Sequence, residues 1–513
     1  MNQRQLTGLC ATLSLLLFAP VCLSEVRLPK LLSDHVVLQR DAPIHIWGWA
    51  DPGEPVNISF TSQKQSTTAD ELGKWSVYLS PEDSGGPYVL TVQGANTVTV
   101  SDVLVGDVWF ASGQSNMQMP LRGFPKSAEL KNSAEEIANA NQPQIRLLRV
   151  HDRPSDHPLP DLQDADEVWT TCTPETAADF SAVAYFFGRE IQQHEKVPIG
   201  LVDDTWGGTP AESWISLDGI SANASLMPIF QTWSQMSNTT SDIPALRAIE
   251  KRADDAAKQA GLPPPKHPWH PVPASYDPSY LYNGMIAPFV GFRIKGVIWY
   301  QGETNSGTSR APMYSKLFPT LINDCRSKWG EGDFPFLFVQ ISSFKSNATE
   351  IWGIIRDAQR RTLSVANTGM AVTLDVGNPD NVHPADKQTV GHRLALTALD
   401  IAYGEHIEDS GPLFREASPQ DGQIRVWFDH SEGLSAQGGA PSGFEVAGED
   451  HKFVPATAKI DGQTIVASAP EIKSPKFVRY AWANVPAANL YNRAGLPAST
   501  FSSENGVDAG TVR

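Results

Sequence analysis

The chain has 513 residues, a net charge of −17 at pH 7, and a composition in which 41% of the residues are hydrophobic. Because a chain of this length is too long for one hydrophobic core, we expect two to four domains. The excess of acidic residues disfavours nucleic acid as a partner, because binding to nucleic acid depends on clustered lysine and arginine.

Residues 1–24 have the pattern of a signal peptide. Arg4 provides a positive start, an apolar stretch covers residues 9–19, and Ser24 is a small residue suited to cleavage. The apolar stretch is shorter than the about 20 residues that span a bilayer. No later segment is long and apolar enough to cross a membrane. We therefore expect an exported protein, periplasmic or extracellular, without a membrane span.

Two cysteines remain beyond that segment, Cys172 and Cys325. Export permits a disulfide between them. Two separate buried thiols are equally compatible with the sequence, because free cysteine is often buried. The sequence leaves both alternatives open.

Residues 25–105 are dense in short β signals. Strand-like runs such as 45–49 and 88–92 are separated by glycine and proline turns such as 51–53 and 85–87. This spacing favours a small β-sandwich-like module. Short β signals return after the central part of the chain, so we expect a second β-rich module over residues 406–513.

Strands and helices alternate between residues 106 and 405, apart from an insertion at about 220–290. The alternation favours an α/β domain with a parallel sheet covered on both faces. Ligands bind such sheets beyond the carboxyl ends of the strands. The expected strands cover residues 107–111, 143–150, 198–206, 294–300, 334–341 and 370–376, and the expected helices cover 180–194, 313–329, 354–365 and 387–403.

Ser115 lies in the segment Gly-Gln-Ser-Asn-Met, residues 113–117, directly after a predicted strand. A turn at this place exposes a hydroxyl to the crevice at the strand ends. The segment is not Gly-x-Ser-x-Gly, because Met117 occupies the last position, so an ordinary α/β-hydrolase elbow is disfavoured. Serine after a strand is also common as a helix cap.

Asp380 and His383 lie on one short loop after the predicted strand at 370–376. An acid three residues before a histidine can accept the Nδ1–H of the imidazole, which leaves Nε2 free to take a proton from serine. The alternative is a turn aspartate beside a surface histidine.

Two further strand ends carry hydrogen-bond donors. Residues 206–209, Trp-Gly-Gly-Thr, allow backbone N–H groups to approach a ligand closely. Residues 300–305 place side-chain amides at the same rim of the sheet. An acyl-transfer site needs such donors for the developing oxyanion. Ordinary tight turns are the alternative for either segment alone.

These blocks resemble those of the SGNH hydrolases, and more narrowly those of the sialate O-acetylesterase-like carbohydrate esterases. The resembling blocks are residues 113–117, 206–209, 299–303 and 380–384. Residues 180–187, 281–286, 489–492 and 495–497 are similar to the same subgroup, so the resemblance covers most of the chain. It implies an SGNH, flavodoxin-like three-layer α/β domain over residues 106–405 and β-rich modules on either side.

The resemblance implies a carbohydrate O-acetylesterase that releases acetate from sialic acids or from plant polysaccharides through an acyl-enzyme, without a cofactor or metal. It implies Ser115 as nucleophile, His383 as base and Asp380 as the residue that orients the base. The implied oxyanion donors are the backbone N–H groups of Ser115 and Gly208 and the side chain of Gln301.

The sequence departs from the wider superfamily at two places. Gln114 replaces the usual acid before the serine, and the third block has no Gly-x-Asn-Asp. Asn305 therefore stays an alternative to Gln301 as the amide donor. The carboxylate of a sialic acid would need a nearby arginine, for which Arg122 and Arg310 are candidates.

Two other classes of function are compatible with parts of the sequence. A metal-dependent deacetylase would need closely spaced ligands, and the histidines that could serve do not have such spacing. A non-catalytic carbohydrate-binding protein is compatible with the β-rich modules. The four histidines considered are His151, His157, His267 and His270.

Overall fold

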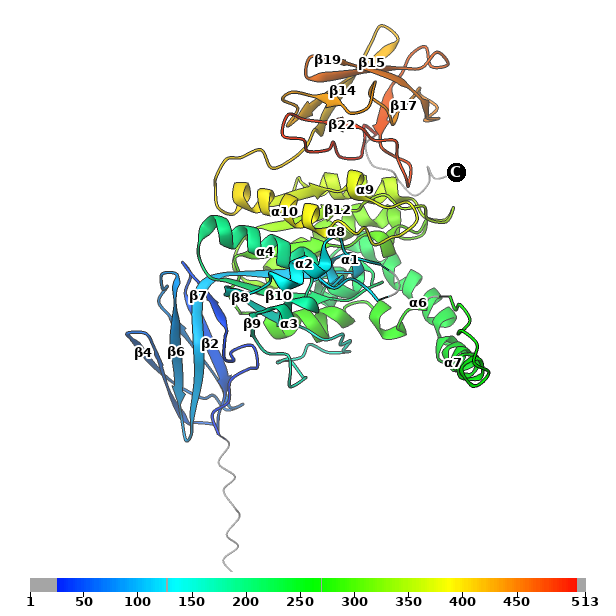
Figure 1. Ribbon diagram of the computed structural model, residues 1–513. Helices are drawn as coiled ribbons and strands as arrows, with labels where there is room; N and C mark the ends of the chain where they lie inside the picture. The colour runs from blue at the N-terminus through cyan, green and yellow to red at the C-terminus, as the bar shows by residue number, and fades with distance from the viewer. Residues whose placement is uncertain (1–24, 126–127, 269, 505–513) are drawn as a thin grey trace, which may run out of the picture.

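The computed structural model describes residues 25–125, 128–268 and 270–504. The predicted signal peptide lies outside the described residues, so export stays a prediction. The described chain forms an N-terminal β module, a central α/β domain and a C-terminal β module (Figure 1). None of the helices in these ranges is long and apolar enough to cross a membrane.

The N-terminal module consists of short strands that pair antiparallel, apart from β1, which pairs parallel with β7 (Thr97–Gly113). Burial alternates residue by residue along β2, as expected for a strand with one face on a core. β2 pairs with β5, and β3 lies between β4 and β6. The bounds are β1 Val37–Gln39, β2 Ile44–Trp49, β3 Pro55–Phe60, β4 Gln63–Thr68, β5 Lys74–Leu79 and β6 Gly85–Gln93.

One long strand, β7 (Thr97–Gly113), belongs to both the N-terminal module and the central domain. Its first part pairs antiparallel with β6, and its last part pairs parallel with two central strands. The sequence pattern predicts a strand only over residues 107–111, where the residues are apolar. Pairing with β6 extends the strand through the more polar residues before them.

The central sheet has the strand order β13-β12-β11-β7-β10-β8-β9. All pairs from β13 to β8 are parallel, which confirms the predicted parallel sheet, and β9 pairs antiparallel at the edge. The bounds are β8 Gln142–Arg149, β9 Thr170–Cys172, β10 Ile199–Thr205, β11 Gly296–Tyr300, β12 Phe336–Gln340 and β13 Thr368–Val372.

β7 occupies the point at which the chain changes direction across the sheet. The strands that follow it directly, β8 and β10, lie on one side of β7, and the later strands β11 to β13 lie on the other. Crevices for ligands form at such switch points, at the carboxyl ends of the strands. Ser115 follows the end of β7 by two residues, so the fold places it at this crevice.

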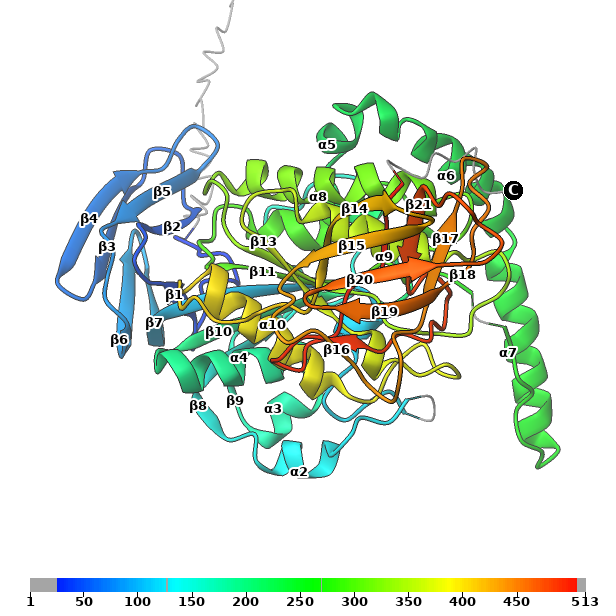
Figure 2. The same ribbon diagram turned by 90° about the horizontal axis from the view of Figure 1, so that it is seen from above.

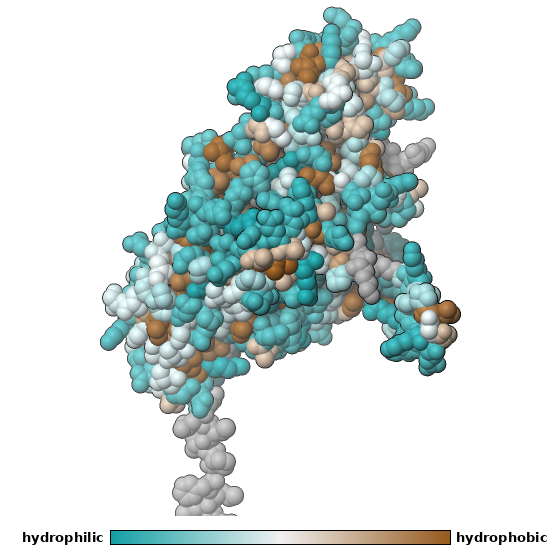
Figure 3. All heavy atoms as spheres, in the orientation of Figure 1, coloured by the Kyte–Doolittle hydropathy of each residue, from teal (hydrophilic) through white to brown (hydrophobic). Residues whose placement is uncertain are grey.

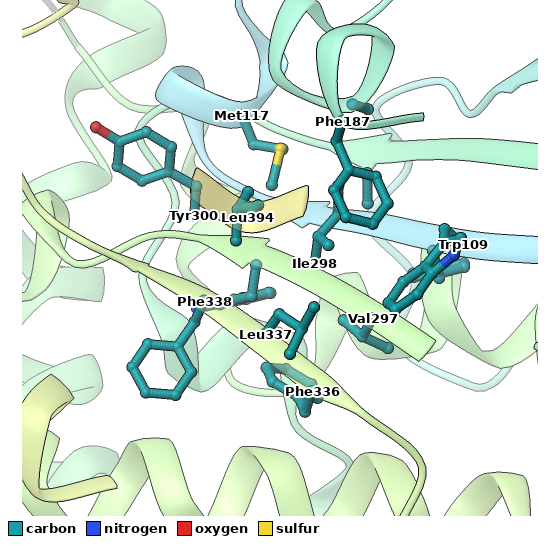
Figure 4. Packing of buried hydrophobic residues seen from close by; sticks show 14 of the residues in the cluster. Trp109, Met117, Phe187, Val297, Ile298, Tyr300, Phe336, Leu337, Phe338 and Leu394 are labelled. Atoms are coloured by element: carbon teal, nitrogen blue, oxygen red, sulfur yellow. The ribbon is translucent and has the colours of Figure 1, made fainter. Parts of the chain in front are cut away.

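Helices cover both faces of the sheet. Trp109 of β7 contacts Phe187 of α4 with ring centroids 4.9 Å apart (Figure 4), whereas Phe110 contacts Trp329 of α8 at 5.6 Å. Successive strand residues point to opposite faces, so β7 is buried from both sides. The helices are α1 Ser115–Gln118, α2 Ser133–Ala138, α3 Pro174–Ala178, α4 Ala182–Glu195, α8 Tyr314–Trp329, α9 Trp352–Thr362 and α10 Lys387–Ile401.

The predicted insertion begins at the end of α5 and contains α6 and α7, which form an arm that projects from the central domain (Figures 1 and 2). The charged segment at 248–261 lies mostly in α7, whose residues are largely exposed. The bounds are α5 Leu217–Ser221, α6 Pro228–Thr240 and α7 Ile243–Gln259.

The C-terminal module lies beside α9 and α10 (Figure 1) and contains two four-stranded sheets, β14-β15-β20-β19 and β18-β17-β21-β23. Buried Arg356 of α9 donates to the carbonyls of Ala481 and Ala483 at 3.0 and 2.5 Å, which joins the module to the domain. The bounds are β14 Leu413–Gln420, β15 Gln423–Asp429, β16 Ser435–Ala436, β17 Phe444–Ala447, β18 Val454–Pro455, β19 Thr457–Asp461, β20 Thr464–Ser468, β21 Phe477–Tyr480, β22 Leu490–Tyr491 and β23 Phe501–Ser502.

Hydrophilic residues dominate the face of the molecule shown in Figure 3, with small hydrophobic areas between them. Cys172 and Cys325 are free thiols, so the structure decides against the disulfide that the sequence left open.

Candidate active site

A pocket of about 850 Å³ lies at the carboxyl ends of the central strands. Its volume is within the range of pockets that enclose a small ligand. The loops after β7, β10 and β11 supply one side, and the segment that leads into α9 and the histidine loop supply the other. The lining includes Gln114, Ser115, Gly207, Gly208, Glu303 and His383.

Ser115 is the first residue of α1 and is partly buried in this pocket. The turn is tight because the carbonyl of Gln114 accepts from the N–H groups of Met117 and Gln118 at 2.8 and 3.0 Å. The backbone N–H of Ser115 donates to no other described residue. Such a group is free to donate to a bound ligand.

Gly207 and Gly208 lie beside the serine. A Cβ on Gly207 would lie 3.1 Å from the Cβ of Ser115, a tight contact, so glycine at this position allows the loop to approach the serine closely. Gly208 has φ +76°, a left-handed conformation that favours glycine. The Gly207 N–H donates to Gln118 Oε1 at 2.9 Å, whereas the Gly208 N–H has no acceptor among the described residues. The structure therefore leaves the N–H groups of Ser115 and Gly208 unpaired at one pocket.

His383 lines the same pocket. Its ring contacts the ring of Phe124 edge to face, with centroids 5.1 Å apart, and its backbone N–H donates to Asn381 Oδ1 at 2.9 Å. The imidazole and Ser115 Oγ share the pocket without a direct hydrogen bond. Catalytic hydrogen bonds are often long in unliganded sites and shorten when substrate binds.

Asp380 is not brought to the imidazole. It is exposed, its backbone N–H donates to Asn378 Oδ1 at 2.9 Å, and its carboxylate forms no hydrogen bond with His383. The side chains of Asn378 and Asn381 bind the backbone of this loop, and Asp380 is left facing solvent. The predicted role of Asp380 as the residue that orients His383 therefore has no contact in the structure to support it.

Gln301 is fully buried and does not line the pocket. Its Nε2 donates to Asn305 Oδ1 at 2.6 Å and to the Thr209 carbonyl at 3.3 Å, and its Oε1 accepts from Tyr314 Oη at 2.9 Å. Every polar atom of the Gln301 amide is therefore bound to protein. Its packing stabilises the loop that carries Gly208.

Asn305, the alternative donor, is also buried and outside the pocket lining. Its Nδ2 donates to Glu212 at 2.8 Å, and its Oδ1 accepts from the Ala211 N–H at 2.9 Å. Neither amide predicted from the third block is placed to reach an oxyanion.

A buried network behind the site was not predicted from the sequence. Asn116 Nδ2 donates to Glu303 at 2.5 Å and to the Val382 carbonyl at 3.0 Å, and its Oδ1 accepts from Lys387 Nζ at 2.5 Å. Asn116 is thus bound to the loop after β11, to the histidine loop and to the start of α10. The network fixes the loop that carries His383 through its backbone. The signal available in the sequence was the position of Asn116 and Lys387, each close to a predicted catalytic residue.

Burial, together with the positive charge of Lys387, lowers the pKa of His383 from 6.5 to about 4. A histidine base must be neutral, and a lowered pKa keeps it neutral in more acidic solution. We therefore expect kcat/KM to stay at its plateau down to about pH 5.5 and to fall with a midpoint at about pH 4–5, below the ~6.5 of an unperturbed histidine.

The measurement is a pH profile of kcat/KM, with a control in which enzyme held at each pH is returned to pH 7 and assayed. That control separates titration of His383 from acid unfolding. A reversible midpoint at pH 6.5 would contradict the burial of the imidazole.

The C-terminal module holds one wall of the pocket. Asn484 donates to the Glu350 carbonyl at 3.1 Å and accepts from the Trp352 N–H at 3.0 Å. Glu350 and Trp352 both line the pocket, and Glu350 also accepts from Trp352 Nε1 at 3.0 Å. The module therefore contributes to the shape of the site, although none of its residues lies in the lining.

None of the four candidate metal-ligand histidines lines the pocket. His151 contacts Asp164 at 3.2 Å, and His157 contacts Asp156. His267 and His270 each bind an acid of the projecting helix α7 at 2.9 Å. His267 and His270 both reach Glu250, at 4.0 and 2.9 Å, but no group of possible metal ligands among the described residues contains more than one of the four histidines.

The known proteins that this chain resembles are carbohydrate acetylesterases, which agrees with the geometry of the pocket. The family model described as carbohydrate esterase, sialic acid-specific acetylesterase, matches residues 269–400. The sialate O-acetylesterase of Mus musculus is 30% identical over 93% of this chain and 94% of that protein. The sialate O-acetylesterase of Homo sapiens is 32% identical over 75% and 73%.

The crystal structure of a carbohydrate acetylesterase from Xanthomonas citri has a TM-score of 0.79 to this structure and is 38% identical, covering 94% of this chain and 100% of that one. Its fold is therefore shared along nearly the whole chain. Fold, pocket and similarity together define this protein as a carboxylic ester hydrolase. The chain belongs to the sialate O-acetylesterase family of carbohydrate esterases.

Proposed function

We propose that this carbohydrate O-acetylesterase cleaves its substrate through an acyl-enzyme on Ser115, with His383 as the general base. The observation that carries the proposal is the convergence of four groups on one pocket: the Ser115 hydroxyl, the His383 imidazole, and the unpaired N–H groups of Ser115 and Gly208. A nucleophile, a base and donors for the oxyanion are the groups that acyl transfer requires.

The reaction proceeds in two displacements. His383 takes the proton of Ser115 as Oγ attacks the acetyl carbonyl carbon, and the sugar oxygen leaves with that proton. Water, deprotonated by His383, then attacks the acetyl-serine and releases acetate. The N–H groups of Ser115 and Gly208 stabilise the negative charge that develops on the carbonyl oxygen in both steps.

The charges of the pocket favour a neutral sugar over a sialic acid. Three acids line it, Asp152, Glu303 and Glu350, against one arginine, Arg310. The charge of Glu303 faces that of buried Lys387, so the repulsion of a carboxylate depends on Asp152 and Glu350. Arg310 already pairs with buried Glu212 at 3.3 Å, so its charge is compensated.

Arg122, the other candidate for a sialate carboxylate, is exposed, pairs with Asp179 and does not line the pocket. The aromatic residues of the lining offer apolar faces to a sugar ring. They are Phe124, Trp206, Tyr276, Phe344 and Trp352.

We expect kcat/KM for acetylated neutral saccharides such as acetylated xylan or xyloglucan oligosaccharides to exceed that for an O-acetylated sialic acid by about tenfold or more. The physical reason is that two like charges about 4 Å apart near a protein surface repel by several kcal/mol, and 1.4 kcal/mol corresponds to tenfold. Acetate release from this panel is the measurement.

The matched control is the methyl ester of the same O-acetylated sialic acid, in which the carboxylate is neutral. The ester should be hydrolysed faster than the free acid at low ionic strength, because only the repulsion differs. A free sialate that is hydrolysed better than both the methyl ester and the neutral saccharides would refute the neutral-sugar assignment. Absence of acetate release from every acetylated sugar would refute the proposed function itself.

A further inference from the structure

One amide nitrogen in the pocket has no partner among the residues that the structure describes. Gln114 is 3% exposed and lines the pocket next to Ser115. Its Oε1 accepts two hydrogen bonds, whereas its Nε2 donates to no described residue. The nitrogen is not among the fully enclosed atoms that lack a partner, so it is open to the pocket, where a bound ligand can accept its hydrogen bond.

The orientation of this amide follows from its oxygen. Oε1 accepts from the backbone N–H of Thr304 at 3.2 Å and from that of Gly302 at 3.4 Å. Both partners are donors, so only the oxygen of the amide can face them. Nε2 must therefore point away from the loop after β11. On that side Gln114 lines the pocket, so Nε2 faces the pocket.

The residue is also held rigidly. The Gln114 N–H donates to the Tyr300 carbonyl at 3.0 Å, and the Gln114 carbonyl accepts from the N–H groups of Met117 and Gln118. The backbone of Gln114 is thus fixed by β11 and α1, and its side-chain oxygen is fixed by the loop after β11. A donor that does not reorganise when charge develops is what electrostatic stabilisation of a transition state requires.

We propose that Gln114 Nε2 is the side-chain donor of the oxyanion hole, acting with the N–H groups of Ser115 and Gly208; this inference rests on the proposed function. As Oγ of Ser115 bonds to the acetyl carbonyl carbon, the π electrons of the carbonyl move to its oxygen. Nε2 donates a hydrogen bond to that oxygen and keeps its own proton. The proton of Ser115 goes to His383, as in the proposed mechanism.

The assignment replaces Gln301, whose amide has no free atom. Both glutamines directly follow a strand of the central sheet: Gln114 follows β7, and Gln301 follows β11. They differ in what their nitrogens contact: Gln301 Nε2 donates to Asn305 and Thr209, whereas Gln114 Nε2 has no acceptor within the described part of the chain.

Two substitutions at Gln114 test the donor. Gln114→Glu keeps an oxygen for the Gly302 and Thr304 N–H groups and places a second oxygen where Nε2 was, which repels an oxyanion. Gln114→Met has a similar length and no donor. Both variants should lower kcat by about 10²–10³ with little change in KM, because the hydrogen bond forms mainly in the transition state.

The matched control is Gln301→Met. It removes a buried amide outside the pocket, so we expect a lower melting temperature and a kcat per active site within about tenfold of the wild type. Active sites are titrated with a serine-directed organophosphate, and the labelled peptide is identified by mass spectrometry.

Gln114→Glu and Gln114→Met variants that fold and turn over within about threefold of the wild type would overturn the inference, as would an effect confined to KM. A large loss of kcat in Gln301→Met, with none in the Gln114 variants, would return the role to Gln301. If the wild type is labelled at Ser115 while these outcomes occur, only the assignment of Gln114 fails. If the wild type is not labelled there, the proposed function fails with it.

Discussion

Ser115→Ala is expected to lower kcat by about 10³ or more while leaving the melting temperature unchanged. Loss of a triad nucleophile has effects of at least this size. The fold should be unaffected because Ser115 Oγ forms no hydrogen bond with a described residue and the side chain is only partly buried. The measurement is kcat per active site, with the concentration of sites determined by organophosphate labelling of the wild type.

The variant should also lose the label, which in the wild type should be found on the peptide containing Ser115. Ser306→Ala is the matched control for labelling, because Ser306 lines the same pocket and its hydroxyl is bound to the Glu303 carbonyl at 2.7 Å. That variant should still be labelled at Ser115. Retention of more than a tenth of the wild-type kcat in Ser115→Ala would exclude Ser115 as the nucleophile.

His383→Ala should lower kcat by a similar factor, about 10³, whereas Asp380→Asn should stay within about tenfold of the wild type. An aspartate that orients a catalytic histidine costs about 10⁴ in kcat when it is changed to asparagine. Asp380 is exposed and does not contact the imidazole, so a much smaller effect is expected. The measurement is kcat and KM for both variants at pH 7, with melting temperatures as a control for folding.

The expectation for Asp380 differs from the one that the sequence suggests. If Asp380→Asn lowers kcat by more than about 10² without a change in melting temperature, the carboxylate must reach His383 in the working enzyme. The small effect expected here would assign the orientation of His383 to the backbone contacts of Asn116 and Asn381 and to packing against Phe124.

Much of the central domain was predictable from local patterns. The strands at 199–205 and 336–340 are continuous apolar or buried runs, and the helix at 387–401 begins after Asp386, which caps it through the Thr389 N–H at 3.0 Å. Such signals are local, because a strand buried on both faces and a capped helix each depend on neighbouring residues.

The long strand β7 was only partly predictable. Its first part is stabilised by pairing with β6, and an alternating polar strand carries a weaker signal than a buried one. The role of the C-terminal module in the pocket was not predictable at all. Asn484 reaches Glu350 and Trp352 from more than 130 positions further along the chain, and no local pattern records that contact.

The sequence by itself determined that a serine, a glycine pair and a histidine follow the strands of one parallel sheet. Strand ends meet at one edge in such a sheet, so Ser115, Gly208 and His383 had to lie near each other. Only the tertiary structure decided which amide and which acid accompany them. Gln301 and Gln114 both follow strand ends, and Asp380 has the spacing of an orienting acid. Hydrogen bonds between distant parts of the chain, from Gln301 to Thr209 and from the loop after β11 to Gln114 Oε1, decide that the Gln301 amide is occupied and that Gln114 Nε2 has no acceptor among the described residues. Asp380 is exposed and does not contact the imidazole. The direction of a side chain depends on these long-range partners, which spacing along the sequence does not encode.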